Sequence, residues 1–298
     1  MTRVDVRFAS GPHWCAAWMY EPSGVEVPGP VIGMAHGLGG VRNMRLDVFA
    51  ERFAAEGYRV LVFDYRHFGE SEGEPRDLLD IKRQIDDWSA ALFYVRSLPQ
   101  VDAKRIVLWG TSLGGGHVIH TAARDGAVAA VISQCPFTDG FASMRTLGLT
   151  SMVKVAVLGV RDALRGFRGG KPLRVSVVGR RGDAALMTAR DVLDGYAALM
   201  PTNYEHPDRV PARVALRIPF YYPGRAAADL NCPALFCVCM KDSVAPPRST
   251  IWHVRKARLG RIKRYPTQHF EIYVEPWCDQ VIADQIEFLR STVPVAPA

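Results

Sequence analysis

The sequence lacks the features that mark membrane-spanning or secreted proteins. Its 298 residues hold no uninterrupted apolar stretch of about 18 residues, the length that a helix needs to cross a bilayer. Residues 1–8 alternate charged and apolar side chains, as a strand does, and lack the apolar core of a signal peptide. We therefore expect a cytoplasmic protein with no membrane span.

The cysteines are not spaced for a metal. No pair has the C-x-x-C spacing that is typical of zinc and redox sites. We therefore predict no metal and no organic cofactor, and we expect reduced, buried thiols. The six cysteines are Cys15, Cys135, Cys232, Cys237, Cys239 and Cys278.

The basic segments lack the interleaved aromatic residues of nucleic-acid-binding proteins. Lys and Arg number 37 against 30 Asp and Glu, a formal net charge of +7, and the excess is concentrated in 161–181 and 255–264. Neither segment matches a known nucleic-acid-binding module, so we expect no such partner. Runs of this kind are usually a solvated face; the alternative is a docking patch for an anionic substrate, a carrier or a membrane surface.

What is present is an ordinary globular composition, with 48% hydrophobic and 22% charged residues, enough for one large core. Short apolar runs alternate with amphipathic segments, which predicts an α/β fold, a mostly parallel sheet with helices on both faces. Residues 3–9 and 13–21 are expected to form an antiparallel hairpin at one edge of this sheet. The other expected elements of this half are strands at 31–35, 59–64, 104–109 and 128–133 and helices at 44–56, 77–98 and after residue 112.

The alternation breaks after the sixth expected strand. Residues 137–230 mix helical segments near 139–166 and 189–200 with a basic, glycine-rich stretch at 166–182. We therefore expect a core domain formed by 1–136 and 231–298, with a mainly helical lid domain, 137–230, inserted into it. The elements that resume the core pattern are a strand at 233–240, a helix near 246–258, a strand at 261–265 and a helix at 277–291.

The segment Gly110-Thr111-Ser112-Leu113-Gly114 lies between a strand pattern and a small-residue helix pattern. In this context G-x-S-x-G exposes the serine hydroxyl on a strained turn, and a Cβ at either glycine would clash with the neighbouring strand or helix. The free backbone N–H groups at the helix start can stabilise a developing negative charge. We therefore predict that Ser112 is a nucleophile.

A second G-x-S-x-G match, at 69–73, has a different context. Ser71 lies between Glu70 and Glu72, whose charges hinder ionisation of its hydroxyl, and Pro75 follows in place of a helix start. We interpret this match as a turn.

A serine hydroxyl needs a general base, usually a histidine held by a carboxylate, before it can attack a carbonyl at pH 7. Catalytic groups of an open parallel sheet lie at the carboxyl ends of its strands. Asp242 follows the strand at 233–240 and His269 follows the strand at 261–265, so the order Ser112, Asp242, His269 predicts a nucleophile–acid–base triad. The rival bases are His36, His117 and His120, and the rival acid is Asp139.

A tetrahedral intermediate needs hydrogen-bond donors aimed at its oxyanion. The backbone N–H of Leu113, one residue after the nucleophile, is one expected donor. The second is expected from the loop 36–40 after the strand 31–35, where glycines let the backbone approach a substrate closely. We assign this second donor to Leu38.

These segments together resemble the α/β-hydrolase superfamily. The residues that carry the resemblance are His36-Gly37-Leu38-Gly39-Gly40, Asp64-Tyr65-Arg66-His67-Phe68-Gly69-Glu70-Ser71, Gly110-Thr111-Ser112-Leu113-Gly114, Asp242 and His269. The core match covers residues 1–135 and 232–292, and the pattern is closest to bacterial esterases and prolyl-peptidase-like hydrolases with a helical lid.

The resemblance implies the same assignment as the residues themselves: Ser112 as nucleophile, Asp242 as acid, His269 as base, and the backbones of Leu38 and Leu113 as oxyanion donors. One position departs from the pattern, because relatives more often carry glycine where this chain has His67.

A serine at this turn points to acyl transfer, since the haloalkane dehalogenases and epoxide hydrolases of the superfamily carry aspartate there. We expect hydrolysis of a small-molecule carboxylic ester through an acyl-enzyme. The alternatives are a thioesterase or acyltransferase acting on a carrier-bound acyl group, an amide- or peptide-cleaving enzyme, and a non-hydrolytic ligand receptor on the same fold. Gly37, Phe137, Tyr221 and Tyr222 are the expected substrate-binding residues, and both a monomer and a homodimer are open.

Overall fold

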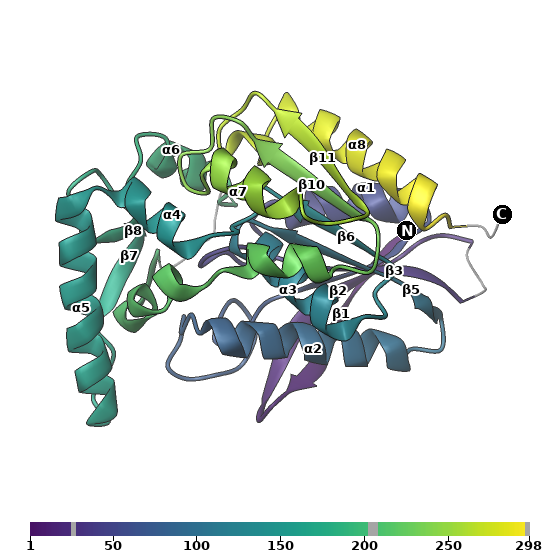
Figure 1. The fold of residues 1–298 in the computed structure, drawn as a ribbon. Coiled ribbons are helices and arrows are strands. Elements are labelled where there is room, and N and C mark those ends of the chain that lie inside the picture. Colours follow the sequence, from purple (N-terminus) through teal and green to yellow (C-terminus); the bar gives the residue numbers. More distant parts are fainter. Residues whose placement is uncertain (25–27, 202–207, 296–298) are drawn as a thin grey trace.

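The computed structural model describes residues 1–24, 28–201 and 208–295, and within them it contains one eight-stranded and one three-stranded sheet (Figure 1). The strands are β1 Thr2–Ser10, β2 His13–Glu21, β3 Gly29–Ala35, β4 Arg59–Phe63, β5 Val101–Thr111, β6 Ala130–Gln134, β7 Arg174–Val178, β8 Ala185–Met187, β9 Arg209–Pro211, β10 Ala234–Cys239 and β11 Gly260–Tyr265. The α-helices are α1 Leu46–Ala55, α2 Ile81–Ser97, α3 Leu113–Asp125, α4 Gly140–Met144, α5 Leu149–Phe167, α6 Val192–Ala197, α7 Pro247–Val254 and α8 Trp277–Thr292.

The large sheet has the order β1-β2-β4-β3-β5-β6-β10-β11. Its strands from β4 to β11 are parallel, and the β1–β2 hairpin adds an antiparallel edge next to β4. Strands β3, β4 and β10 are buried along their whole length, as their apolar sequences require when helices cover both faces. Figure 1 shows α1 and α8 on one face and α2 and α3 on the other. The predicted sheet and its edge hairpin are confirmed.

Helix α2 begins at Ile81 and not at residue 77, where the sequence pattern had placed its start. Asp80 caps the helix, because its carboxylate accepts a hydrogen bond from the backbone N–H of Arg83 at 3.1 Å. Further along α2, the buried carboxylate of Asp87 accepts a hydrogen bond from Ser10 at 2.6 Å and pairs with Arg66 at 2.5 Å. The Ser10 bond ties the helix to the edge hairpin, and the Arg66 pair ties it to the loop after β4.

The insertion that follows β6 contains a small sheet besides its helices. This sheet, in the order β8-β7-β9, was not predicted, since β7 lies inside the basic, glycine-rich stretch. The buried carboxylate of Asp162 on α5 holds the sheet to the helix: it accepts the backbone N–H groups of Leu173 at 2.7 Å and Arg213 at 2.9 Å and pairs with the Arg213 guanidinium. Residues 202–207 of the expected lid lie outside the described residues, and the domain boundaries stay a prediction.

Among the residues that the structure describes, no helix is long and apolar enough to cross a bilayer. In the same residues, no group of three or more His, Cys, Asp and Glu side chains is arranged to hold a metal ion. The six cysteines all belong to the described ranges, where they are buried and form no disulfide.

Candidate active site

The turn between β5 and α3 carries Ser112 in a strained conformation. Its backbone has φ 54° and ψ −119°, a combination that non-glycine residues rarely adopt. A Cβ at Gly110 would collide with the carbonyl oxygen of Gly114, and a Cβ at Gly114 would collide with the carbonyl oxygen of His36. Both glycines of the motif are therefore required by the close approach of strand, helix and loop.

The structure brings the side chains of Ser112, Asp242 and His269 together at the carboxyl ends of β5, β10 and β11. His269 Nδ1 donates to Asp242 Oδ2 at 2.7 Å, since a carboxylate can only accept. This leaves His269 Nε2 to accept a hydrogen bond from the Ser112 hydroxyl at 3.0 Å. The second oxygen of Asp242 accepts the backbone N–H groups of Val244 at 2.8 Å and Ala245 at 2.7 Å. The carboxylate is therefore fully bonded and the imidazole is held in the tautomer that a general base needs.

Burial and charge act in opposite directions on His269. The His269 and Asp242 side chains are only 1% and 2% exposed. Burial disfavours the imidazolium, but the neighbouring Asp242 carboxylate favours it and contributes to raising the pKa of His269 to about 9. The histidine therefore binds a proton more tightly than a free imidazole does, as a base that must take the serine proton requires.

The backbone N–H of Leu113 lies in the first turn of α3, where helix geometry provides no acceptor for it. Leu38 lies in the loop after β3, and both leucines line the same cavity as Ser112. A Cβ at Gly37 would come within 2.7 Å of the Ser112 Cβ, so only glycine lets this loop pass so close to the serine. The two residues expected to donate to the oxyanion thus line the same cavity as Ser112, and their role stays a prediction.

His36 shapes this loop with both of its ring nitrogens. Nδ1 accepts the backbone N–H of Gly37 at 2.7 Å, and Nε2 donates to the carbonyl of Met44 at 3.0 Å. Its ring stacks on Tyr273, with 5.9 Å between centroids. From the sequence, His36 was predicted only as a rival base; its bonds indicate a structural role next to Gly37.

The other rival bases lie along α3. His117 accepts the Tyr221 hydroxyl at Nδ1, at 2.8 Å, and donates from Nε2 to Gln84 at 2.9 Å. Burial, aided by His120, lowers the pKa of His117 to about 3, so the ring stays neutral. His120 is half-buried on the same helix, and burial also lowers its pKa.

The rival acid, Asp139, caps α4. Its carboxylate accepts the backbone N–H of Ala142 at 2.9 Å and the hydroxyl of Ser249 at 3.0 Å, and it lies 3.5 Å from His253 Nε2. These partners belong to α4 and α7, so Asp139 acts on helix geometry and not on His269.

The second G-x-S-x-G match forms a turn. The Ser71 hydroxyl accepts the backbone N–H of Ala16 at 2.8 Å and donates to the carbonyl of Asp64 at 2.7 Å. In the same turn His67 has φ 74°, a conformation that favours glycine, and its ring accepts a hydrogen bond from Arg83 at 3.0 Å. His67 therefore adopts the backbone conformation that explains why glycine is more usual at this place in the resembled superfamily.

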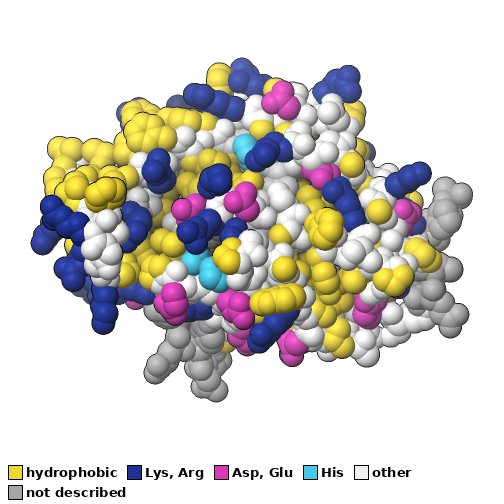
Figure 2. Space-filling model, turned by 90° about the horizontal axis from the view of Figure 1, so that it is seen from below, with side chains coloured by type: hydrophobic (Ala, Val, Ile, Leu, Met, Phe, Trp, Pro, Cys, Tyr) yellow, Lys and Arg dark blue, Asp and Glu magenta, His cyan; other side chains and the backbone are white. Residues whose placement is uncertain are grey.

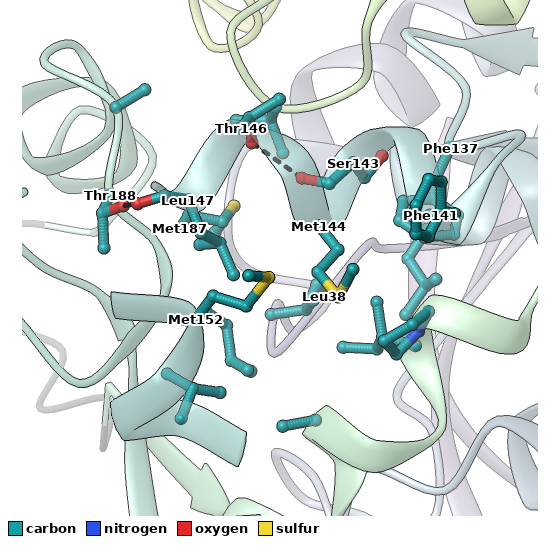
Figure 3. Close-up of a pocket in the computed structure, with 18 of the residues that line it drawn as sticks. Leu38, Phe137, Phe141, Ser143, Met144, Thr146, Leu147, Met152, Met187 and Thr188 are labelled. Carbon is teal, nitrogen blue, oxygen red and sulfur yellow. Dashed lines mark hydrogen bonds between the residues drawn. The ribbon is translucent and has the colours of Figure 1, made fainter. Parts of the chain in front are cut away.

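A cavity of about 310 Å³ extends from Ser112 into the insertion (Figure 3). Figure 3 shows Met144, Met152 and Met187 pointing into it from α4, α5 and β8. Two hydroxyls of its wall are bonded to backbone: Thr146 donates to Ser143 at 2.8 Å and Thr188 to Leu147 at 2.9 Å. A third, that of Ser243, donates to the carboxylate of Asp191 at 2.7 Å. The remaining lining residues are Leu38, Ser112, Leu113, Phe137, Phe141, Val155, Ala156, Leu186, Ala189, Ala215, Leu216, Ile218, Pro219, Phe220, Tyr222, Ser243 and Val244.

Of the expected substrate-binding residues, Phe137 and Tyr222 line the cavity, and Gly37 lies beside Ser112. Tyr221 packs against Phe137, and its hydroxyl is bonded to His117 instead of facing the cavity. The cavity lining from α4, α5 and β8 was not predicted from the sequence. The apolar periodicity of 149–167 was the only signal, and it does not say which of the apolar residues face inward.

Known proteins resemble this chain along its whole length. Residues 27–171 match the family model described as "Serine aminopeptidase, S33". The quorum-quenching protein AidA of Acinetobacter baumannii (strain MDR-ZJ06) is 51% identical over 292 residues, which are 98% of this chain and 96% of AidA. A polyketide transferase of Stachybotrys chlorohalonatus (strain IBT 40285) is 34% identical over 184 residues, 61% of this chain and 59% of the transferase.

A solved structure, that of the alpha/beta hydrolase GrgF from Penicillium sp. sh18, superimposes with a TM-score of 0.84 at 21% identity, over 98% of this chain and 99% of GrgF. The predicted fold class is confirmed by this match.

The reactivity of Ser112 should rise with pH, because His269 Nε2 can accept the serine proton only when it carries none. We expect the rate at which a fluorophosphonate labels Ser112 to rise with a midpoint above pH 6.5, toward about pH 9. Asp242→Asn removes the carboxylate that favours the imidazolium, so it should lower both the rate and the midpoint. The measurement is the labelling rate from about pH 5 to about pH 10.

Asp139→Asn is the matched control, since it removes the rival carboxylate, and it should leave the midpoint unchanged. A wild-type midpoint at or below 6.5, or a shift caused by Asp139→Asn alone, contradicts the assignment.

Proposed function

Since this chain belongs to the α/β-hydrolase superfamily, we propose that it hydrolyses carboxylic esters of apolar acids through an acyl-enzyme on Ser112. The observation that carries the proposal is the hydrogen-bonded series Ser112–His269–Asp242 at one end of an apolar cavity. A nucleophile, its base and an orienting carboxylate within hydrogen-bond distance are what serine acyl transfer requires.

In the proposed first half-reaction the Ser112 oxygen attacks the ester carbonyl carbon while its proton passes to His269 Nε2. The carbonyl oxygen becomes an oxyanion and accepts the backbone N–H groups of Leu38 and Leu113. When the intermediate collapses, the bond to the leaving alcohol breaks, and that alcohol takes the proton from His269. Asp242 stabilises the imidazolium and keeps it oriented.

In the second half-reaction water replaces the alcohol. His269 accepts one of its protons as the water oxygen attacks the acyl carbon, and the same two N–H groups stabilise the new oxyanion. The bond to the Ser112 oxygen then breaks, the serine regains its proton from His269, and the carboxylic acid leaves. The enzyme returns to its starting state with no cofactor involved.

The chemistry of the cavity supports an apolar acyl part. Its walls are mainly aliphatic, aromatic and thioether side chains, and Thr146 and Thr188 use their hydroxyls within the wall. Methionines such as Met144, Met152 and Met187 adapt to flexible chains of different length. The name of the 51% identical relative describes quorum quenching. Cleavage of an ester or lactone in an acylated signal has that effect, so we propose acylated lactones as substrates too.

A second candidate is transfer of the acyl group from a thioester to a nucleophile other than water. The name of the Stachybotrys relative, a polyketide transferase, favours it. The same acyl-enzyme would form, and the acceptor alone would differ. Product analysis with added alcohols or thiols distinguishes the two, because a transferase yields the new ester or thioester in place of the free acid.

Ser112→Ala should lower kcat/KM for p-nitrophenyl esters by on the order of 10⁵-fold or more while the fold is retained. Among the residues that the structure describes, Ser112 is the one whose hydroxyl is bonded to His269 Nε2. Ser71→Ala is the matched control from the second motif. It should leave kcat/KM unchanged and lower the free energy of unfolding by about 1–3 kcal/mol, since two buried backbone groups lose their partner. Hydrolysis retained in Ser112→Ala overturns the proposed nucleophile.

Met187→Trp should shorten the acyl chains that the enzyme accepts, because the larger side chain fills part of the cavity. We expect kcat/KM for a decanoyl ester to fall about 10- to 200-fold, the range over which small changes in an apolar pocket act. The acetyl ester serves as the internal control and should change little. An equal loss for both esters indicates a misfolded site, and no loss for either means that the acyl group binds elsewhere.

A further inference from the structure

Helix α5 exposes an apolar face to the surface of the molecule. Its exposed apolar residues recur every three or four positions, so they lie on one side of the helix. They include Leu149, 73% exposed, and Phe167, 93% exposed. The full set is Leu149, Val153, Val157, Val160, Leu164 and Phe167, here called the α5 stripe.

Cations flank the α5 stripe on one side. Lys154, Arg161, Arg165 and Arg168 are all exposed and lie next to it on the helical surface. The acidic residue of α5, Asp162, is buried on the opposite side and paired with Arg213. Figure 2 shows hydrophobic side chains gathered at the end of the molecule where α5 lies, with Lys and Arg side chains beside them.

The charge pattern distinguishes between two occupants of the stripe. A second copy of this chain would bring further cations to the stripe, and α5 has no exposed carboxylate to pair with them. An anionic surface can pair with Arg161, Arg165 and Arg168, and with Lys154 besides its hydrogen bond to the carbonyl of Gly182 at 2.8 Å. Helices that lie in the plane of a membrane interface also have an apolar stripe bordered by Lys and Arg.

We propose that α5 docks this protein onto an anionic phospholipid bilayer, with the α5 stripe in the boundary between headgroups and acyl chains and the flanking cations against lipid phosphates. The docking is peripheral, since only the outer side of the helix can enter the lipid and its inner side packs on the insertion.

Helix α5 forms part of the cavity wall. Met152 and Ala156 of α5 line the cavity, and the exposed rings of Phe141 and Phe220 line it as well. A docked α5 therefore places this wall of the cavity next to the lipid surface. A membrane-dissolved apolar ester could then enter the cavity from the bilayer, a consequence that rests on the proposed function, whereas the docking itself does not.

The test is sedimentation of the whole protein with vesicles of phosphatidylcholine alone or of phosphatidylcholine with phosphatidylglycerol. We expect binding to the anionic vesicles, little binding to the neutral ones, and weaker binding as salt is raised. Arg161→Gln/Arg165→Gln should weaken binding on the order of fivefold for each cation removed. Leu164→Glu/Phe167→Glu should reduce it to the level of the neutral vesicles.

Two matched controls separate α5 from the rest of the surface. Arg255→Gln/Arg258→Gln removes two exposed cations from the other basic segment, and Phe93→Glu replaces an exposed phenylalanine of α2. Both should bind anionic vesicles as the wild type does. Turnover of a water-soluble acetyl ester by the α5 variants shows that they are folded. If the wild type does not turn this ester over either, the folding of the variants is checked by circular dichroism.

Three outcomes overturn the proposal. The first is no sedimentation with anionic vesicles. The second is unchanged binding by Leu164→Glu/Phe167→Glu. The third combines two results: the wild type is a dimer by light scattering that Leu164→Glu/Phe167→Glu converts to a monomer, and the wild type binds no vesicles. The α5 stripe is then covered by a second copy of this chain.

Discussion

The turn at Ser112 is the constraint on which the other parts of the site depend. Strand becomes helix there within one residue, and there is no room for a Cβ at Gly110, Gly114 or Gly37. The serine hydroxyl lies at the edge where β5, β10 and β11 end, bonded to His269. Because these strands are parallel, residues far apart in the sequence, Asp242 and His269 among them, reach that same edge.

Polar and apolar tasks are divided between the sheet and the insertion. The sheet edge carries the hydrogen-bonded side chains, and the insertion contributes mainly apolar side chains to the cavity wall. Helix α5 belongs to both the cavity and the surface: Met152 and Val155 line the cavity, while Leu164 and Phe167 face outward. This division supports a substrate with a reactive carbonyl and an apolar chain, and the outer face supports a lipid partner.

The sequence predicted well whatever depends on local pattern. Apolar runs bounded by turns indicated the strands of the large sheet, and G-x-S-x-G between strand and helix indicated the turn at Ser112. Prediction from the sequence failed where a single capping residue or a tertiary contact determines where an element begins or whether it forms. Asp80 moves the start of α2, and β7 forms because its partners β8 and β9 come from later in the chain. The orientation of Tyr221 likewise depends on His117, which lies about a hundred positions earlier.

The most direct test of the central claim is the mass of the intact protein, quenched shortly after mixing with an activated acyl ester, followed by mapping of the modified peptide. A covalent intermediate on Ser112 predicts one added acyl group on the peptide that contains Ser112, and its loss as the free acid appears. Turnover without any adduct in the burst phase, or an adduct that maps to another residue such as Cys135, contradicts the account.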